Sequence, residues 1–172
     1  NLDEIKEEIL KESKKELYKR LGEIKNNFQR EWQRYPETVK DKEKEEIAIV
    51  FTYNTNAIEG STITLEETRE IIKDKIAPSK PLKDIRETEA HAKAFLKMLE
   101  KKEKISHNLL LKWHQEIFGE TKEDIAGKYR DYPVRVGNYT APDWQDAKKL
   151  MNELIRFVQQ NKSHPVELAA RT

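Results

Sequence analysis

The chain has 172 residues, of which 38% are charged, and its 33 lysines and arginines nearly balance its 32 aspartates and glutamates. This balance leaves no global field that would attract nucleic acid or an anionic membrane. The chain has no cysteine, which excludes disulfides, cysteine-ligated zinc and thiol nucleophiles. No apolar run is long enough to span a bilayer, and no signal-like stretch opens the chain. We expect a cytoplasmic protein that binds neither membrane nor nucleic acid through this segment.

The first segment has the pattern of one long amphipathic helix that ends at about residue 33. Its apolar residues recur at spacings of three and four: Leu2, Ile5, Ile9, Leu17, Leu21, Ile24, Phe28 and Trp32. Tyr35-Pro36 ends the pattern, because the residue before proline avoids the helical region. We assign residues 1–40 to this helix and residues 41–172 to the remainder. The apolar stripe is suited to a partner helix, and a homodimer is one possibility.

The stretch from Ile47 to Gly60 is the segment around which the rest of the chain is organised. Its apolar spacing predicts a helix with one buried face, formed by Ile47, Val50, Phe51, Asn54 and Ile58. Gly60 stands where a left-handed C-cap belongs. Thr55 and Glu59, four residues apart, share a face in the last turn. A carboxylate there faces the negative end of the helix dipole, so Glu59 either points to water or has a cationic partner.

Two further helices are predicted between residues 64 and 100. Thr64 and Glu67 have the spacing of a capping box, which starts a helix at Leu65 that runs to about Ile76. Asp84 is the expected cap of the next helix. That helix should bury Ile85, Ala92, Phe95, Leu96 and Leu99, and should leave Arg86, Glu89 and His91 on the surface.

The last third of the chain combines three helices with one extended segment. Ser106 and Gly119 bound a short helix, and the stretch 127–139 is rich in strand formers between two glycines, which predicts a small hairpin or flap. Pro142-Asp143 opens a helix whose expected buried side is Trp144, Leu150, Leu154, Phe157 and Val158. Ser163-His164-Pro165 starts the last helix. About seven helices and one hairpin result, so we predict a mainly helical, all-α fold.

Residues 55–60, Thr-Asn-Ala-Ile-Glu-Gly, fit the inhibitory motif Ser/Thr-x-x-x-Glu-Gly/Asn of the Fic family, in the variant whose inhibitory helix precedes the catalytic core. The later stretches ETEAHAKAF, LLLKWHQEIF, GKYR with V-x-V, and HPVELAA follow in the order of the Fic core, so that residues 45 to 172 resemble the family. The resemblance implies a Fic-like helical core with an inhibitory helix at about 42–60 and a flap at about 127–139.

The resemblance also implies an activity. Fic enzymes of this kind are nucleotidyltransferases that use ATP and Mg²⁺ to transfer AMP to a Ser, Thr or Tyr hydroxyl of a target protein. The implied inhibitory residues are Thr55, Glu59 and Gly60. The implied residues of a flap that binds the target by strand-like pairing are Tyr129, Val134, Arg135 and Val136.

The defining family motif, His-x-Phe-x-Asp/Glu-Gly-Asn-Gly-Arg, does not occur in this chain. The motif would supply the general base, the metal-binding acid and the phosphate cradle. We therefore expect no catalytic residue in these 172 residues, poor binding of ATP and Mg²⁺, and no activity of the chain alone. We favour a piece of a longer protein over a complete protein that has lost its catalytic loop.

Two alternatives remain from the residues themselves. A metal site built from His91, His107, His114 and His164 is disfavoured, because no pair has the i,i+4 spacing that brings two imidazoles to one ion. A non-catalytic helical interaction module, which would use the N-terminal helix and the flap, is the main rival to the enzyme. The transferred group and the target protein are left open.

Overall fold

The computed structural model describes residues 2–101 and 103–172, and the chain divides into two compact units, Asn1–Glu43 and Lys44–Thr172. The first unit is dominated by the long helix α1 (Leu2–Arg34), as the sequence predicts. The rings of Phe28 and Trp32 stack near its end, with centroids 5.4 Å apart. No helix in the described parts of the chain combines the length and apolar character needed to cross a bilayer.

Helix α2 (Glu37–Ile58) begins directly after Pro36, well before the start that we predicted. The predicted buried face of this helix is also wrong. Its fully buried side chains are Ala48, Ile49 and Thr52, whereas Ile47, Val50, Phe51 and Ile58 are exposed, Ile58 by 83%. Residues 47–51 are all apolar and together surround the helix, so their spacing does not indicate which face is buried. The small side chains of Ala48 and Thr52 form the face that packs inward.

The core of the second unit lies under α2, and its buried cluster consists of Ile49, Ile63, Ile71, Ile72, Ile85 and Ala92. Helix α3 (Leu65–Arg69) begins at the predicted capping box, in which Thr64 Oγ1 accepts from the backbone N–H of Glu67 and Glu67 accepts from the N–H of Thr64. It continues as one π-helical turn, η1 (Glu70–Asp74), and ends there rather than at Ile76. Lys75 adopts a left-handed conformation with φ 59°.

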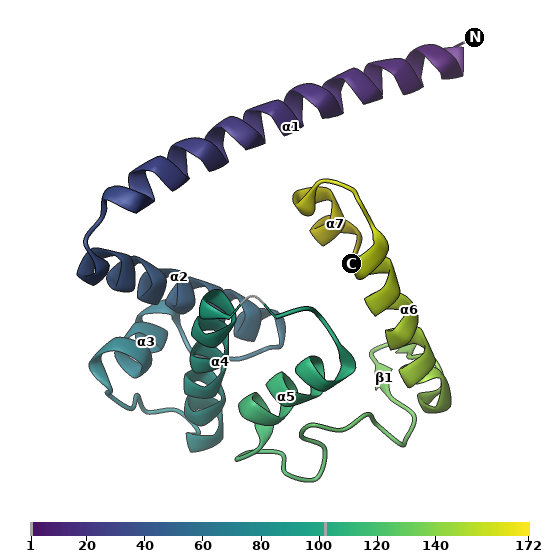
Figure 1. Cartoon of the computed structure of the whole chain (residues 1–172). Coiled ribbons are helices and arrows are strands. Elements are labelled where there is room, and N and C mark those ends of the chain that lie inside the picture. The colour runs from purple at the N-terminus through teal and green to yellow at the C-terminus, as the bar shows by residue number, and fades with distance from the viewer. Residues whose placement is uncertain (1, 102) are drawn as a thin grey trace. The chain divides into compact units, whose positions relative to one another are not determined.

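Helices α4 (Leu82–Glu100) and α5 (His107–Phe118) pack against each other (Figure 1). The predicted cap of α4 is wrong, because Pro81 occupies the N-cap position and Asp84 lies in the first turn. Ile85 and Ala92 are buried as predicted, but Leu99 is exposed. The Ser106 hydroxyl caps α5 by accepting from the N–H of Leu109 at 3.2 Å, as expected.

The expected hairpin is present but shorter than predicted. Strands β1 (Arg135–Val136) and β2 (Tyr139–Thr140) pair antiparallel around the two-residue loop Gly137-Asn138, with Val136 opposite Tyr139. Gly137 has φ 58°, a conformation that favours glycine in a tight hairpin loop. Residues 129–134 precede the strands as irregular chain.

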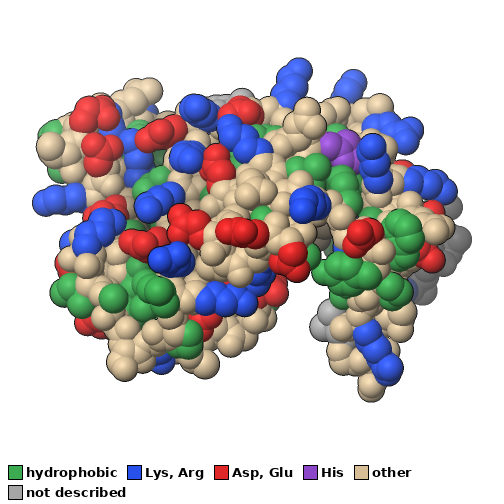
Figure 2. Space-filling view, turned by 90° about the horizontal axis from the view of Figure 1, so that it is seen from below, with side chains coloured by type: hydrophobic (Ala, Val, Ile, Leu, Met, Phe, Trp, Pro, Cys, Tyr) green, Lys and Arg blue, Asp and Glu red, His purple; other side chains and the backbone are tan. Residues whose placement is uncertain are grey.

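Asp143 caps a short 3-10 turn, η2 (Trp144–Asp146), which leads into α6 (Ala147–Gln160) against α5. The predicted burial on α6 is largely wrong: Ile155 is its buried residue, and Trp144, Leu150, Leu154 and Phe157 are exposed. Helix α7 (Pro165–Arg171) begins at the predicted Ser-His-Pro sequence. The fold is therefore mainly α, as predicted. Charges of both signs are interspersed on the face that Figure 2 shows.

Candidate functional site

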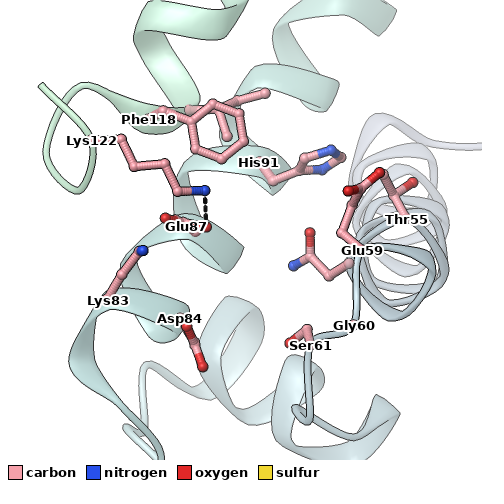
Figure 3. A pocket seen from close by; sticks show the side chains of 12 residues that line it. Thr55, Glu59, Gly60, Ser61, Lys83, Asp84, Glu87, His91, Phe118 and Lys122 are labelled. Carbon is pink, nitrogen blue, oxygen red and sulfur yellow. Dashed lines mark hydrogen bonds and ion pairs between the residues drawn. The ribbon is translucent and has the colours of Figure 1, made fainter. Parts of the chain in front are cut away.

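A pocket of about 610 Å³ lies where the end of α2 meets α4 and the end of α5 (Figure 3). The exit of α2 lines it with Thr55, Asn56, Glu59, Gly60 and Ser61. Helix α4 contributes Lys83, Asp84, Glu87 and His91, and the α5 side contributes Ile117, Phe118 and Lys122. The pocket thus brings together all three residues of the predicted inhibitory motif, Thr55, Glu59 and Gly60.

The exit of α2 has the hydrogen bonds of a Schellman motif. The N–H of Ser61 donates to the carbonyl of Asn56 at 2.9 Å, and that of Gly60 donates to the carbonyl of Ala57 at 3.1 Å. Gly60 has φ 87°, the left-handed conformation that the sequence predicted. This turn places Glu59 at the C-cap, with an exposed side chain at the wall of the pocket.

A hydrogen bond between the side chains of Asn56, which lines the pocket, and Thr88 links α2 to α4. Asn56 Nδ2 donates to Thr88 Oγ1 at 3.1 Å, and the Thr88 hydroxyl donates to the carbonyl of Asp84 at 2.8 Å. Thr88 is fully buried, and its hydroxyl is satisfied both as donor and as acceptor. This contact adds to the core packing of Ala48, Ile49 and Thr52 in holding the end of α2, which carries Glu59.

His91 lies in the same contact between α2 and α4, although the sequence placed it on the surface. Its Nδ1 lies 3.4 Å from Thr52 Oγ1, and its ring stacks against Phe51 with centroids 5.7 Å apart. Burial lowers the pKa of His91, which favours the neutral imidazole. His91 follows Thr88 by three residues, so the two side chains share one face of α4. This spacing is the feature of the sequence that could have indicated the contact of His91 with α2.

The wall opposite Glu59 is held by a charged network. Glu87 accepts hydrogen bonds from Thr121 Oγ1 at 2.7 Å and from Lys122 Nζ at 3.3 Å. The dashed line in Figure 3 marks the contact between Lys122 and Glu87. The Lys122 ammonium also lies 4.1 Å from the centroid of the Phe118 ring, a cation–π geometry. These contacts join α4 to the segment that follows α5.

The charges at the pocket do not fit a metal-bound triphosphate. Three carboxylates, those of Glu59, Asp84 and Glu87, stand against two ammonium groups, those of Lys83 and Lys122, and Lys122 is already paired with Glu87. Within the described residues, no group of three or more His, Asp or Glu side chains is arranged to hold a metal ion. We therefore derive no chemical step through ATP or Mg²⁺ in this chain.

The predicted flap residues are not among the residues that line the pocket. Tyr129 and Val134 are half-buried in the irregular chain before the strands, and Arg135 is exposed at the start of β1. The backbone of Val136 pairs with Tyr139, and its side chain lies outside the described parts. Arg135 Nε donates to the carbonyl of Gly137 at 3.0 Å across the loop.

The described geometry defines a helical fold with a hairpin, in which a helix end bearing a glutamate faces a pocket. Residues 104–172 match the Fic/DOC family. The chain is 32% identical over 126 residues to the protein adenylyltransferase Fic of Nematostella vectensis, covering 69% of this chain and 30% of the relative. It is 29% identical over 134 residues to the protein of the same name from Drosophila ananassae, covering 74% of this chain and 27% of the relative. The chain thus spans less than a third of the length of these relatives.

Solved structures show the same fold. Fic-1 of C. elegans (residues 134–508) superposes with a TM-score of 0.63 at 24% identity, covering 84% of this chain and 45% of that one. A Fic family protein from Desulfovibrio desulfuricans G20 superposes with a TM-score of 0.60 at 23% identity, covering 73% of this chain and 39% of that one. The match of residues 104–172 to the Fic/DOC family and the likeness to these relatives confirm the predicted family resemblance.

Proposed function

We propose that the protein containing this chain transfers AMP from ATP to a Ser, Thr or Tyr hydroxyl of a target protein, with Mg²⁺, and that Glu59 inhibits the transfer. The names of the relatives support the activity, since both are called protein adenylyltransferases. The observation that carries the inhibitory role is the position of Glu59, at the C-cap of α2 and at the wall of the pocket.

The inhibitory role has a simple physical basis. A carboxylate at the C-terminus of a helix gains nothing from the helix dipole, so it is available to a cation that enters the pocket. An arginine that pairs with Glu59 cannot grip a phosphate in the same geometry. Thr55, one turn earlier on the pocket side of α2, and Gly60, which provides the turn, would hold the carboxylate in place.

The proposed roles of the remaining parts follow. The flap residues Tyr129, Val134, Arg135 and Val136 would align the target, because a short strand pair offers backbone groups for pairing. We propose that the 172-residue chain by itself does not transfer AMP, since its pocket carries more carboxylates than ammonium groups. A homodimer and a cytoplasmic location stay predictions.

The test uses the full reading frame that contains the chain. Purified protein is incubated with ATP labelled at the α-phosphate, and label in protein is measured for the parent, Glu59→Gly and Glu59→Gln. Both variants should incorporate more label than the parent, since both remove the charge. Glu100→Gly is the matched control, because Glu100 is an exposed acid at the end of α4 and does not line the pocket.

Equal label in the parent and both variants would refute the inhibitory role of Glu59. Absence of label in all of them would favour the second candidate, a non-catalytic interaction module. The apolar face of α2 around Val50 and Phe51, which borders a shallow hollow of about 640 Å³, supports that candidate.

A further inference from the structure

We propose that two histidines of α5, His107 and His114, are positioning residues that hold the flap in its orientation through contacts with Tyr129 and Gly127. The contacts themselves are observed in the described residues. Their effect on target binding rests on the proposed function, in which the flap aligns the target.

The two histidines lie on one face of α5. They are seven residues apart, which is nearly two full turns and a rise of about 10 Å. The chain that leads into the flap runs antiparallel to this face, since Gly127 meets His114 and Tyr129 meets His107. The sequence shows this arrangement only as an i,i+7 spacing of two histidines, which differs from the i,i+4 spacing of metal-binding pairs.

His114 holds the first contact through a backbone group. The N–H of Gly127 donates to His114 Nδ1 at 2.9 Å. Gly127 has φ 68°, a conformation that favours glycine, and a Cβ atom there would lie 3.0 Å from Gln115 Cβ, so a side chain at this position would be strained and crowded against α5. Nδ1 accepts this bond only in a neutral imidazole with its proton on Nε2. Burial, and then the nearby Lys122 ammonium, lower the pKa of His114, which favours that state.

His107 holds the second contact and joins three elements. Its Nδ1 lies 2.5 Å from the Tyr129 hydroxyl, and its Nε2 lies 2.5 Å from Asn152 Oδ1 on α6. The partners assign the tautomer: Nε2–H donates to the amide oxygen, and Nδ1 accepts from the phenol. Burial raises the pKa of Tyr129, so the phenol keeps the proton that it donates.

Arg130 carries this anchoring over to the hairpin. Its guanidinium donates to the carbonyl of Tyr132 at 2.9 Å and to the carbonyl of Pro142, one on each leg of the flap. The N–H of Ala141 donates to the carbonyl of Val134 at 3.0 Å and closes the base further. The strands between these legs therefore take their orientation from the segment that the two histidines fix.

The consequence for function is a smaller entropic cost of target binding. A flap held in one orientation loses less freedom when a target strand pairs with it than a loose flap does. Loss of either histidine contact should therefore weaken target binding, without changing groups that react.

Amide hydrogen exchange in the 172-residue chain tests the first contact. His114→Leu introduces an apolar side chain of similar size that cannot accept the hydrogen bond of the Gly127 N–H. His114→Asn instead places an acceptor, Oδ1, near the position of Nδ1. His114→Leu should raise exchange rates over residues 128–142 roughly threefold to tenfold, the effect of one lost hydrogen bond. His114→Asn should restore most of the protection. Asn108→Leu, at an exposed position of α5, is the matched control.

A second pair of variants tests the His107 contact independently. Tyr129→Phe removes only the hydroxyl that meets His107, and should raise exchange in the same segment. Tyr132→Phe removes a hydroxyl at an exposed position and should leave it unchanged. NMR of the ring nitrogens adds a direct signature, since the neutral rings of both histidines should be Nε2–H tautomers.

Equal protection of residues 128–142 in the parent, His114→Leu and Tyr129→Phe would overturn the inference, and so would an Nδ1–H tautomer at both histidines. These readouts measure the order of the flap and not AMP transfer. Absence of transfer in the Glu59→Gly protein would thus refute the proposed function and leave the positioning role standing.

Discussion

Asn56 at the end of α2 donates a hydrogen bond of 3.1 Å to the hydroxyl of Thr88 in α4. This bond links the end of α2, with Glu59 three residues later, to a helix that forms another side of the pocket. Thr88 is fully buried, whereas Asn56 is half-buried and lines the pocket.

Thr88→Val should destabilise the chain, because it preserves the shape of the side chain and removes the acceptor of Asn56. Because the Asn56 amide lines the pocket and is only half-buried, the expected loss is the net contribution of one hydrogen bond, about 0.5–1.5 kcal/mol. The measurement is the free energy of unfolding from urea titration. Thr62→Val, at an exposed position, is the control and should change this energy little. Equal losses in both variants would mean that the hydrogen bond contributes nothing specific.

The caps and ends of several helices could be predicted from the sequence. The Thr64–Glu67 capping box, the left-handed Gly60 and the Ser106 cap all appear as expected, because each depends on neighbouring residues and a defined backbone geometry. These features fixed the ends of helices, and so the position of Glu59 at an exit of α2.

Which face of each helix is buried could not be predicted in the same way. Ile47 and Ile49 are equally apolar, yet one is exposed and the other is fully buried. The choice depends on the close approach of α2 to α4, which brings Thr52 to His91 and Asn56 to Thr88. Contacts between residues more than thirty positions apart are not encoded in local periodicity.

Glu46→Gln should reduce the dependence of the unfolding free energy on pH in the acidic range. A hydrogen bond from Arg69 holds the pKa of the Glu46 carboxyl below its ordinary value of 4.5, and the charges of Arg69 and Lys73 add to the effect. A carboxyl with a lowered pKa contributes stability that is complete above the ordinary value and is lost as the pH falls through the lowered one. Urea titrations between pH 6 and pH 3 measure this dependence. A Glu46→Gln slope equal to that of the parent would contradict the contribution of the Arg69 contact.

His91 should titrate below its ordinary pKa of 6.5, because burial disfavours the imidazolium. The folded state then binds fewer protons than the unfolded state, so stability is complete above pH 6.5 and falls as the pH decreases through the lowered pKa. NMR titration of the His91 ring measures the pKa directly. His91→Phe should reduce the pH dependence of the unfolding free energy over this range. A ring that titrates at or above 6.5 would contradict the buried position.

Gly60→Ala and Gly22→Ala should have opposite effects on stability. At Gly60 a Cβ atom would meet nothing within 4 Å, so the cost of alanine is conformational, about 1–2 kcal/mol for a residue held in the left-handed region. Gly22 lies inside α1, also with open space around a Cβ atom, and alanine there should stabilise the helix by about 0.5–1 kcal/mol. Urea titration of both variants checks the signs.

The same substitution bears on the proposed inhibition. Alanine at Gly60 weakens the turn that ends α2, so the carboxylate of Glu59 is held less firmly, although its charge remains. In the full-length protein, Gly60→Ala should therefore incorporate more AMP label than the parent and less than Glu59→Gly. Gly22→Ala, which changes no residue of the pocket, should match the parent. Label in Gly60→Ala that equals the parent would mean that the inhibitory carboxylate does not depend on the left-handed turn.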